Sequence, residues 1–400
     1  MIVGASTAGA AAAYTLRAVG HEGPITLVGA EDTAPYERPP LSKTVLTAAE
    51  EPEAVWLLPT DTYASRDITL RLGAPVTSVE LASGGFSLTI EDREQIAADV
   101  VVLATGGRAR RPAGLPEDPR IHVLRTWADA RALRAHMRTA HRALVLGSGL
   151  IGAECAASAS AQGLDVEVLE MQTTPFPSIA SRAVRTTLLR TFAEHGVRFR
   201  TGVTVNNCTP TDDGLVVQLS DGTVLEVDLL VVGIGIEPAT ELAERAGAAT
   251  ERGVLVDESM RTSVPGLYAA GDVASRRLGG RLIRHEHFAS AQAQGEAAAR
   301  AIAGLEPVPL PTPWAWSDQF SHRLEVPGEP DAADYTRLRQ PGDGQIVEFS
   351  IADSRLVGLT ALDQPRVVRE ARRLIGGRLR GSANDLERTD VPLKQLVDAP

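Results

Sequence analysis

The hydrophobic pattern at the start of the chain predicts a strand, a helix and a second strand in close succession. Residues 1–3 form a short apolar run, and residues 4–9 (GASTAG) follow it as a glycine-rich turn. The small apolar residues after the turn favour a helix that ends at Gly20, and residues 24–31 (PITLVGAE) predict a second strand ending in Glu31. This order of elements is typical of one half of a nucleotide-binding α/β domain.

The first turn carries the fingerprint of a dinucleotide site. Its glycines allow the backbone to approach a pyrophosphate, and the start of the helix offers N–H groups to the phosphate charge. Glu31 lies 22 residues after Gly9, where an acid binds ribose hydroxyls. Ser6 replaces the middle glycine of the usual motif; its Cβ crowds the approach, but its hydroxyl can donate to a phosphate oxygen. A chance glycine-rich turn is the alternative. The predicted contact residues are Gly4, Ser6, Thr7, Ala8, Gly9 and Glu31.

The same pattern returns about 140 residues later with a complete GxGxxG motif. A strand is expected at residues 143–146, a helix ending near Gly163, and a second strand that closes with Glu170. A glutamate at that place binds a free ribose diol and repels a 2′-phosphate, so it favours NADH over NADPH. Two such units predict two dinucleotides in one chain. The residues predicted at the second site are Gly147, Gly149, Leu150, Ile151, Gly152 and Glu170.

A third motif lies at residues 264–273 (VPGLYAAGDV). The pattern predicts a strand that ends in small residues, after which Gly271 and Asp272 open a helix. An aspartate there either reaches a ribityl hydroxyl or a bridging phosphate, or simply caps the helix. The residues alone leave both interpretations open.

The composition narrows the class of partner. The chain is 44% hydrophobic and 23% charged, as is typical of globular proteins, and its net charge of −11 argues against nucleic acid or an anionic membrane as the main partner. No apolar run is long enough for a membrane helix, and no signal peptide is visible, so a cytoplasmic location is expected. Cys155 and Cys208 are far apart and are predicted to be buried thiols. The histidines show no metal-ligand spacing beyond the weak pair His285 and His287, so no metal site is expected.

Four segments in this order resemble the FAD-dependent NADH:ferredoxin reductases that serve oxygenases and cytochromes P450, of the putidaredoxin-reductase type. They are APYERPPLSK (34–43), LATGGRARRP (103–112), GSGLIGAE (147–154) and LYAAGDV (267–273). The resemblance implies an α/β fold with two Rossmann-like dinucleotide-binding domains, of the glutathione-reductase-like FAD/NAD(P) type, plus a C-terminal α+β domain. The implied division is an FAD-binding domain at 1–112 and 237–306, an NADH-binding domain at 113–236 and a C-terminal domain at 307–400.

The resemblance gives the proline-rich loop at residues 35–43 a role. Its prolines fix the backbone, so the loop can hold Arg38 and Lys43 at defined places. Arg38 suits a phosphate or the flavin edge. In the family, the lysine of this loop lies beside the flavin and pairs with a glutamate that corresponds to Glu154, which predicts a catalytic Lys43–Glu154 pair next to flavin N5. A surface lysine and a helix-face glutamate are the alternative. Relatives that reduce peroxide, oxygen or coenzyme-A disulfide carry a redox cysteine near this loop, where the present chain has Ser42.

Further cofactor contacts follow from the same resemblance. Glu286 and Phe288 are expected to begin a helix directed at the flavin pyrimidine. Arg125 is expected on the FAD, with a salt bridge at a domain junction as the alternative, and Trp316 is expected to cover the flavin, with a plain core role as the alternative. The implied FAD contacts are Val76, Ala104, Thr105, Gly106, Arg125, Gly271, Asp272, Glu286, Phe288 and Trp316; the implied NADH contacts are Glu154, Gly235 and Glu237.

The implied function is the transfer of electrons from NADH through FAD, one at a time, to a small iron–sulfur ferredoxin that feeds a cytochrome P450 or another oxygenase. Alternatives are a reductase for rubredoxin or a nitrite-reductase module, an NADH oxidase or peroxidase of the same fold, and an NADH-sensing protein that resembles apoptosis-inducing factor. Because ferredoxins are usually acidic, a locally basic surface is expected to dock the partner. Residues 366–380, with six arginines, and residues 276–284 are the two candidates, and solvated faces without a partner are the alternative.

Overall fold

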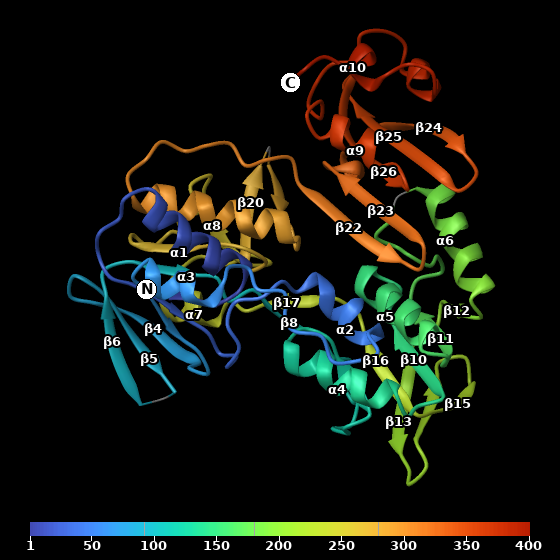
Figure 1. Cartoon of the computed structure of the whole chain (residues 1–400), viewed down its shortest axis with the longest axis horizontal. Helices are drawn as coiled ribbons and strands as arrows, with labels where there is room; N and C mark the ends of the chain where they lie inside the picture. Colours follow the sequence, from blue (N-terminus) through green and yellow to red (C-terminus); the bar gives the residue numbers. More distant parts are fainter. Residues whose placement is uncertain (92, 180, 279) are drawn as a thin grey trace. The chain divides into compact units, whose positions relative to one another are not determined.

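The computed structural model describes residues 1–400 except 92, 180 and 279. The described chain divides into two compact units, each with its own sheets (Figure 1). The first unit comprises Met1–Pro39, Glu53–Arg108 and Ile236–Pro311, and the second comprises Pro40–Pro52, Ala109–Gly235 and Thr312–Pro400. Among the described residues, no helix combines the length and the apolar character that a membrane crossing requires.

A parallel sheet forms the centre of the first unit. Its strand order is β19–β7–β1–β2–β3, and helix α1 (Thr7–Ala18) leaves β1 through the first glycine-rich turn. Helix α8 (Phe288–Ile302) packs along α1 (Figure 1). The two helices approach closely because Gly295 has no side chain; a Cβ at this position would lie 2.2 Å from the carbonyl oxygen of Ala8. The strand bounds are β1 Ile2–Val3, β2 Ile25–Val28, β3 Ile68–Arg71, β7 Val101–Leu103 and β19 Leu267–Ala269.

Smaller sheets and helices complete the first unit. Strands β4, β5 and β6 form an antiparallel sheet, β8 pairs with β17, and β20 lies between β18 and β21. The bounds are β4 Val76–Ala82, β5 Gly85–Ile90, β6 Glu94–Ala98, β8 Gly107–Ala109, β17 Ile236–Pro238, β18 Val254–Val256, β20 Ala274–Leu278, β21 Arg281–Ile283, α3 Thr60–Ser65 and α7 Glu241–Arg245.

The second unit contains a second parallel sheet, in the order β12–β11–β10–β16–β9. Helix α5 (Leu150–Ala161) follows β10 through the second glycine-rich turn, and its residues from Gly152 to Ala159 are all buried. Apart from Glu154, this buried run consists of glycine, alanine, cysteine and serine, whose short side chains allow the helix to pack on all sides. The remaining bounds are α4 Trp127–Met137, α6 Arg182–Glu194, β9 Ile121–Val123, β10 Arg142–Leu146, β11 Asp165–Glu170, β12 Arg198–Thr201, β13 Val205–Pro210, β14 Leu215–Leu219, β15 Val224–Val227 and β16 Leu229–Val232.

The C-terminal part of the second unit is an antiparallel sheet in the order β22–β23–β26–β25–β24. It shares one hydrophobic core with the parallel sheet, since Leu324 and Leu362 cluster with Val145 and Val168. The ring of Phe320 also meets that of Phe192 on α6 at a centroid distance of 5.0 Å. The bounds are β22 Trp314–Gln319, β23 His322–Pro327, β24 Tyr335–Gly342, β25 Gln345–Ala352, β26 Arg355–Leu362, α9 Pro365–Ala371 and α10 Leu393–Leu396.

The proline-rich loop is more regular than a stiff connection. It forms the 3₁₀ helix η1 (Pro39–Ser42), which leads into the short helix α2 (Thr44–Thr47). Leu46 of α2 joins the core of the second unit, and the Arg134 guanidinium on α4 donates to the carbonyl oxygen of Ala48 at 2.7 Å. The segment is therefore anchored directly after Lys43.

Three local predictions need correction. Strand β2 ends at Val28, so Glu31 lies in the loop that follows. Gly271 and Asp272 do not open a helix: Gly271 adopts a positive φ of 83°, and the turn leads into β20, whose pairing with β18 and β21 outweighs local helix preference. Helix α8 begins at Phe288 with His287 as its N-cap, so Glu286 precedes the helix.

We predict that Gly295→Ala destabilises the protein. Glycine to alanine within a helix normally stabilises by about 1 kcal/mol, but the added Cβ here meets backbone and should cost about 1–3 kcal/mol. The midpoint of thermal unfolding measures the change, with Ala297→Ser on the same helix as the control. A variant at least as stable as the wild type would show that α1 and α8 do not pack this closely.

Candidate active site

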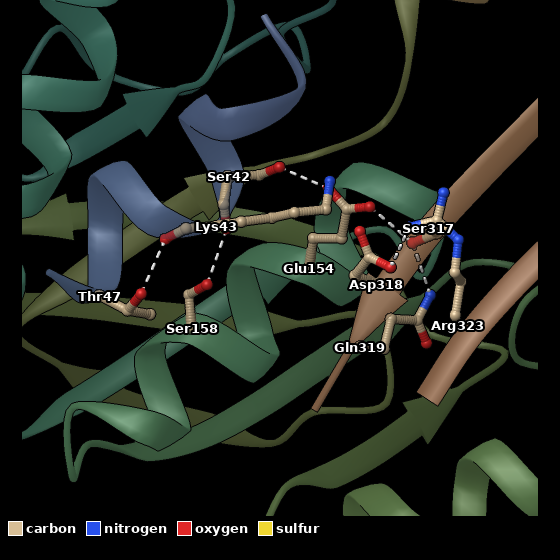
Figure 2. A network of polar contacts seen from close by, with 9 residues as sticks. All are labelled: Ser42, Lys43, Thr47, Glu154, Ser158, Ser317, Asp318, Gln319 and Arg323. Atoms are coloured by element: carbon tan, nitrogen blue, oxygen red, sulfur yellow. Dashed lines mark hydrogen bonds and ion pairs between the residues drawn. The ribbon is translucent and has the colours of Figure 1, made fainter. Parts of the chain in front are cut away.

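Lys43 and Glu154 form an ion pair within the second unit. The Lys43 Nζ lies 2.8 Å from Glu154 Oε2, and the carboxylate side chain is only 2% exposed while that of the lysine is 20% exposed (Figure 2). The predicted contact between these two residues is confirmed. Their catalytic role stays a prediction.

The second glycine fingerprint determines where Glu154 lies. Gly147 adopts a φ of +92°, and a Cβ on Gly152 would come within 2.1 Å of the Gly147 carbonyl oxygen. The helix can therefore begin directly over the turn, with Gly149 as its N-cap and without a capping side chain. Glu154 follows these glycines within the first two turns of the helix, directly after the turn that is predicted to bind a dinucleotide.

Two serine hydroxyls complete the environment of the Glu154 carboxylate. Ser42 Oγ donates to Oε2, and Ser317 Oγ donates to Oε1 at 2.6 Å. The Ser158 hydroxyl in turn donates to the carbonyl oxygen of Ser42 at 2.7 Å (Figure 2). A buried ion pair is stable only when additional hydrogen bonds satisfy its remaining atoms, and these donors meet that requirement.

Ser317 was not predicted from the sequence. It lies on β22, 163 residues after Glu154, and it follows Trp316, which was predicted. The sequence of β22 (WAWSDQ) does not reveal its buried face by hydrophobicity, because the buried positions are Ala315, Ser317 and Gln319 while the tryptophans are only partly buried. Nothing in this pattern identifies Glu154 as the residue that Ser317 contacts.

A second cluster of charges lies at the first fingerprint, within the first unit. Arg38 Nη2 lies 2.8 Å from Glu31 Oε1, and the hydroxyl of Tyr36 donates to Glu31 Oε2 at 2.6 Å. Arg38 Nε also donates to Ser6 Oγ at 3.1 Å. The structure thus brings together three residues predicted from the sequence, and adds Tyr36. The arginine brings a positive charge to the turn that is predicted to bind phosphate.

The first turn fits the pyrophosphate of a dinucleotide. Gly4 adopts a φ of +115°, and a Cβ there would lie 2.1 Å from the carbonyl oxygen of Ala104. The N-cap residue of α1, Ser6, makes no capping hydrogen bond with its side chain, so it does not compete with a phosphate for the first N–H groups of the helix. A backbone-lined turn with a nearby arginine is suited to FAD.

The second turn fits a dinucleotide in the same way, with an acid held in place. The buried Glu170 accepts hydrogen bonds from the backbone N–H of Ser148 at 3.0 Å and from its hydroxyl at 2.7 Å. The N–H of Gln172 donates to the other carboxylate oxygen at 2.9 Å. Ser148, the variable residue inside GxGxxG, was not predicted to have this role. It fixes the glutamate that is predicted to favour NADH.

Other predicted positions lie at the ends of strands or in turns. Thr105 Oγ1 donates to the carbonyl oxygen of Ala239 at 2.9 Å, and the N–H of Gly271 donates to Gln294 Oε1 at 2.8 Å. Gln294, on the buried side of α8, was missed because a polar residue in an alanine-rich helix carries no motif. Glu286 forms an ion pair with Arg284 at 2.6 Å, and the backbone N–H of Arg125 donates to the Asp129 carboxylate at 3.0 Å. The contacts of these predicted residues with a cofactor remain predictions.

Trp316 belongs to an aromatic and charged cluster on the C-terminal sheet. Its ring stacks on that of Trp314 at a centroid distance of 4.7 Å, and the Arg323 guanidinium lies 6.0 Å from the Trp316 ring centroid. Glu325, the register partner of Trp316 on β23, is buried, and burial raises the pKa of its carboxyl above the usual value of 4.5.

Neither cysteine is suited to redox chemistry. Cys155 and Cys208 are free and buried, and burial raises the pKa of each thiol. A thiol with a raised pKa supplies little of the thiolate that attacks disulfides or peroxides. The described residues also contain no cluster of histidine, cysteine or acidic side chains that could hold a metal ion.

Comparisons with known proteins agree with this architecture. Residues 1–295 match the model of the family described as "Pyridine nucleotide-disulphide oxidoreductase", and residues 314–397 match that described as "Reductase C-terminal". The chain is 36% identical to terpredoxin reductase of a Pseudomonas species, over 99% of this chain and 97% of the relative. It is 35% identical to the biphenyl dioxygenase system ferredoxin–NAD(+) reductase component of Paraburkholderia xenovorans (strain LB400), over 100% of this chain and 98% of the relative.

A solved structure extends the similarity to three dimensions. The covalent putidaredoxin reductase–putidaredoxin complex contains a chain that superposes with a TM-score of 0.92 at 31% identity, over 98% of this chain and 96% of that chain. The predicted fold class and the resemblance to this group of reductases are confirmed. The predicted boundaries of the three domains stay a prediction.

We predict that the Glu325 carboxyl makes stability depend on pH. The pKa of this carboxyl is higher in the folded state than in the unfolded state. Between these two pKa values the folded state binds more protons, so the free energy of unfolding falls as the pH rises through this range. Glu325→Gln stays neutral and avoids this loss. The unfolding midpoint of the variant should therefore rise relative to that of the wild type as the pH increases above about 4.5. Glu387→Gln, at an exposed acid, is the control, and a constant difference across this range would contradict the prediction.

Proposed function

Because the chain belongs to the pyridine nucleotide-disulphide oxidoreductase family, we propose that it passes electrons from NADH through FAD to a small iron–sulfur ferredoxin. The ferredoxin would in turn feed a cytochrome P450 or another oxygenase; among the relatives, the ferredoxin–NAD(+) reductase component of the biphenyl dioxygenase system belongs to such an oxygenase system. The observation that carries the proposal is the buried Lys43–Glu154 pair, which lies directly after the second dinucleotide fingerprint.

The two glycine-rich turns would hold the two cofactors. Gly4 and the N-terminus of α1 would receive the FAD pyrophosphate, with Arg38 supplying positive charge and Glu31 binding ribose. The second turn would receive NADH, with Glu170 on its ribose diol. When bound at the first turn, FAD would supply the redox chemistry that converts the two-electron donor NADH into a source of single electrons for an iron–sulfur acceptor.

The role of Lys43 and Glu154 would be electrostatic and positional. Their charges are fixed by mutual contact and by the serine hydroxyls, so they need little reorganisation when charge moves nearby. Neither group would act as a nucleophile. The pair would orient the nicotinamide and balance the charge that reduction places on the cofactor.

A cysteine-dependent oxidase or peroxidase activity is disfavoured by the same site. The Ser42 hydroxyl donates to Glu154, and a serine oxygen cannot form a sulfenate or a mixed disulfide. The raised pKa of the Cys155 thiol, caused by burial, leaves that residue unreactive as well.

The basic segment at residues 366–380 is the better candidate for the ferredoxin surface. Arg366, Arg369 and Arg373 are exposed there. The Arg372 guanidinium of the same segment lies 4.3 Å from the ring centroid of Trp314, which stacks on Trp316. In residues 276–284, Arg277 pairs with Glu251 and Arg284 pairs with Glu286. In residues 366–380, Arg380 pairs with Asp398, but this ion pair does not involve the three exposed arginines.

We assign the protein to the cytoplasm as part of this proposal. Both cysteines are free thiols within the described residues, which is usual for proteins of a reducing compartment.

The function is tested by mixing the purified protein with NADH or NADPH and a panel of ferredoxins. We expect a yellow protein that contains FAD, is bleached faster by NADH than by NADPH, and reduces at least one ferredoxin. A protein that takes up no FAD, or whose bound FAD is not reduced by NADH, would contradict the proposal.

Lys43→Met should retain FAD and be reduced by NADH about ten- to a hundredfold more slowly, because the ion pair is lost while the length of the side chain is kept. Stopped-flow absorbance at the flavin band measures the rate. Lys394→Met, at a lysine outside the site, is the control. Equal reduction rates in Lys43→Met and the wild type would dismiss the catalytic pair.

Charge reversal at Arg366 and Arg369 should weaken coupling to ferredoxin without changing reduction by NADH. Ferredoxin-dependent cytochrome c reduction by the wild type should fall severalfold between about 50 mM and about 500 mM NaCl, and the variant should start lower and respond less. Arg190→Glu, an exposed arginine on α6, is the control. If salt has no effect on the wild-type rate, this surface is not an electrostatic dock.

A further inference from the structure

Strand β22 presents two chemically different faces. Ala315, Ser317 and Gln319 are buried at every second position, whereas Trp314 and Trp316 occupy intervening positions on the other face and stack on each other. The strand packs against α5, and Ser317, which is fully buried, donates to the Glu154 carboxylate there (Figure 2). One face of the strand thus carries a tryptophan pair, and the other carries a hydrogen-bond donor to the Lys43–Glu154 ion pair.

The hydrogen-bonding direction of Ser317 is determined by its neighbours. The Gln319 side-chain amide donates to Ser317 Oγ at 3.1 Å, so the serine oxygen acts as an acceptor on that side. Its single proton is then directed to Glu154 Oε1, since a carboxylate paired with a lysine can only accept. Gln319, Ser317 and Glu154 therefore form a directed chain of hydrogen bonds that begins in the C-terminal sheet.

We propose that Ser317 is a positioning residue for the Lys43–Glu154 pair, so that the C-terminal sheet builds part of the NADH-dependent site. The inference rests on the proposed function and extends it to a residue outside both dinucleotide fingerprints. Ser317 acts through Glu154.

The two oxygens of Glu154 are held from different sides. Ser42 and Lys43 both bind Oε2, and both belong to the segment that carries η1 and α2. In the described part of the chain, Oε1 accepts from Ser317 alone. Without this donor, the carboxylate would keep one unsatisfied buried oxygen and could rotate about its last side-chain bond. Such rotation would also move the oxygen that holds the Lys43 ammonium.

The test compares Ser317→Ala with Ser317→Thr, which keeps a hydroxyl. Reduction of bound FAD by NADH is followed by stopped flow, and the limiting rate is separated from the NADH dissociation constant. We expect Ser317→Ala to lower the limiting rate about tenfold with little change in NADH affinity, and Ser317→Thr to recover most of the loss. As a control, the bound FAD of Ser350→Ala, a variant at a buried serine on β25 of the same sheet, should be reduced by NADH at the wild-type rate.

A double-mutant cycle with Glu154→Ala gives a readout that a general packing defect would not reproduce. If Ser317 acts through Glu154, Ser317→Ala should lower both the limiting rate and the unfolding midpoint in the wild type, but neither in the Glu154→Ala background. Additive losses would overturn the proposal. An unchanged limiting rate in Ser317→Ala, or a threonine variant as slow as the alanine variant, would also overturn it, even if Glu154→Ala did not fold. If the proposed function itself were wrong, NADH would not reduce the bound FAD of the wild-type protein, and this outcome differs from all of those above.

Discussion

A carboxylate that is withdrawn from water must be neutralised, and the second unit is arranged around that requirement at Glu154. Lys43 forms an ion pair with this carboxylate, Ser42 donates a hydrogen bond to its Oε2, and Ser317 donates one to its Oε1. Removing one partner from such a group costs far more than the net stabilisation that the whole set provides. The interaction is therefore better understood as a device for fixed geometry than as a source of stability.

Small residues make this arrangement possible. Helix α5 can be buried from Gly152 to Ala159 because its side chains there, apart from that of Glu154, are short. The glycines before it let the chain turn tightly enough for the helix to start over the parallel sheet. The first unit uses the same principle where α8 meets α1. In both units, close backbone approach provides a surface suited to phosphate and leaves charged side chains to the edges of the turn.

The dinucleotide fingerprints could be predicted because their physical requirements are local: a glycine with positive φ, a helix that starts at once, and an acid one strand later. The Lys43–Glu154 contact followed from a family resemblance and is present. Ser317 could not be inferred, since strand pairing and packing across 163 residues place it. The turn at Gly271 was predicted wrongly for the same reason: β20 is determined by its sheet partners rather than by its own preference.

The shared core of the second unit limits how such chains can be recombined. Leu324 and Leu362 pack with residues of the parallel sheet, and His322 joins Asp363 to Thr191 on α6 through hydrogen bonds of 2.6 Å and 3.0 Å. The C-terminal sheet is therefore no exchangeable module. A chimera that took this sheet from a relative would also need an α6 surface that matches it. The new sheet would in addition have to carry a hydroxyl group opposite Glu154.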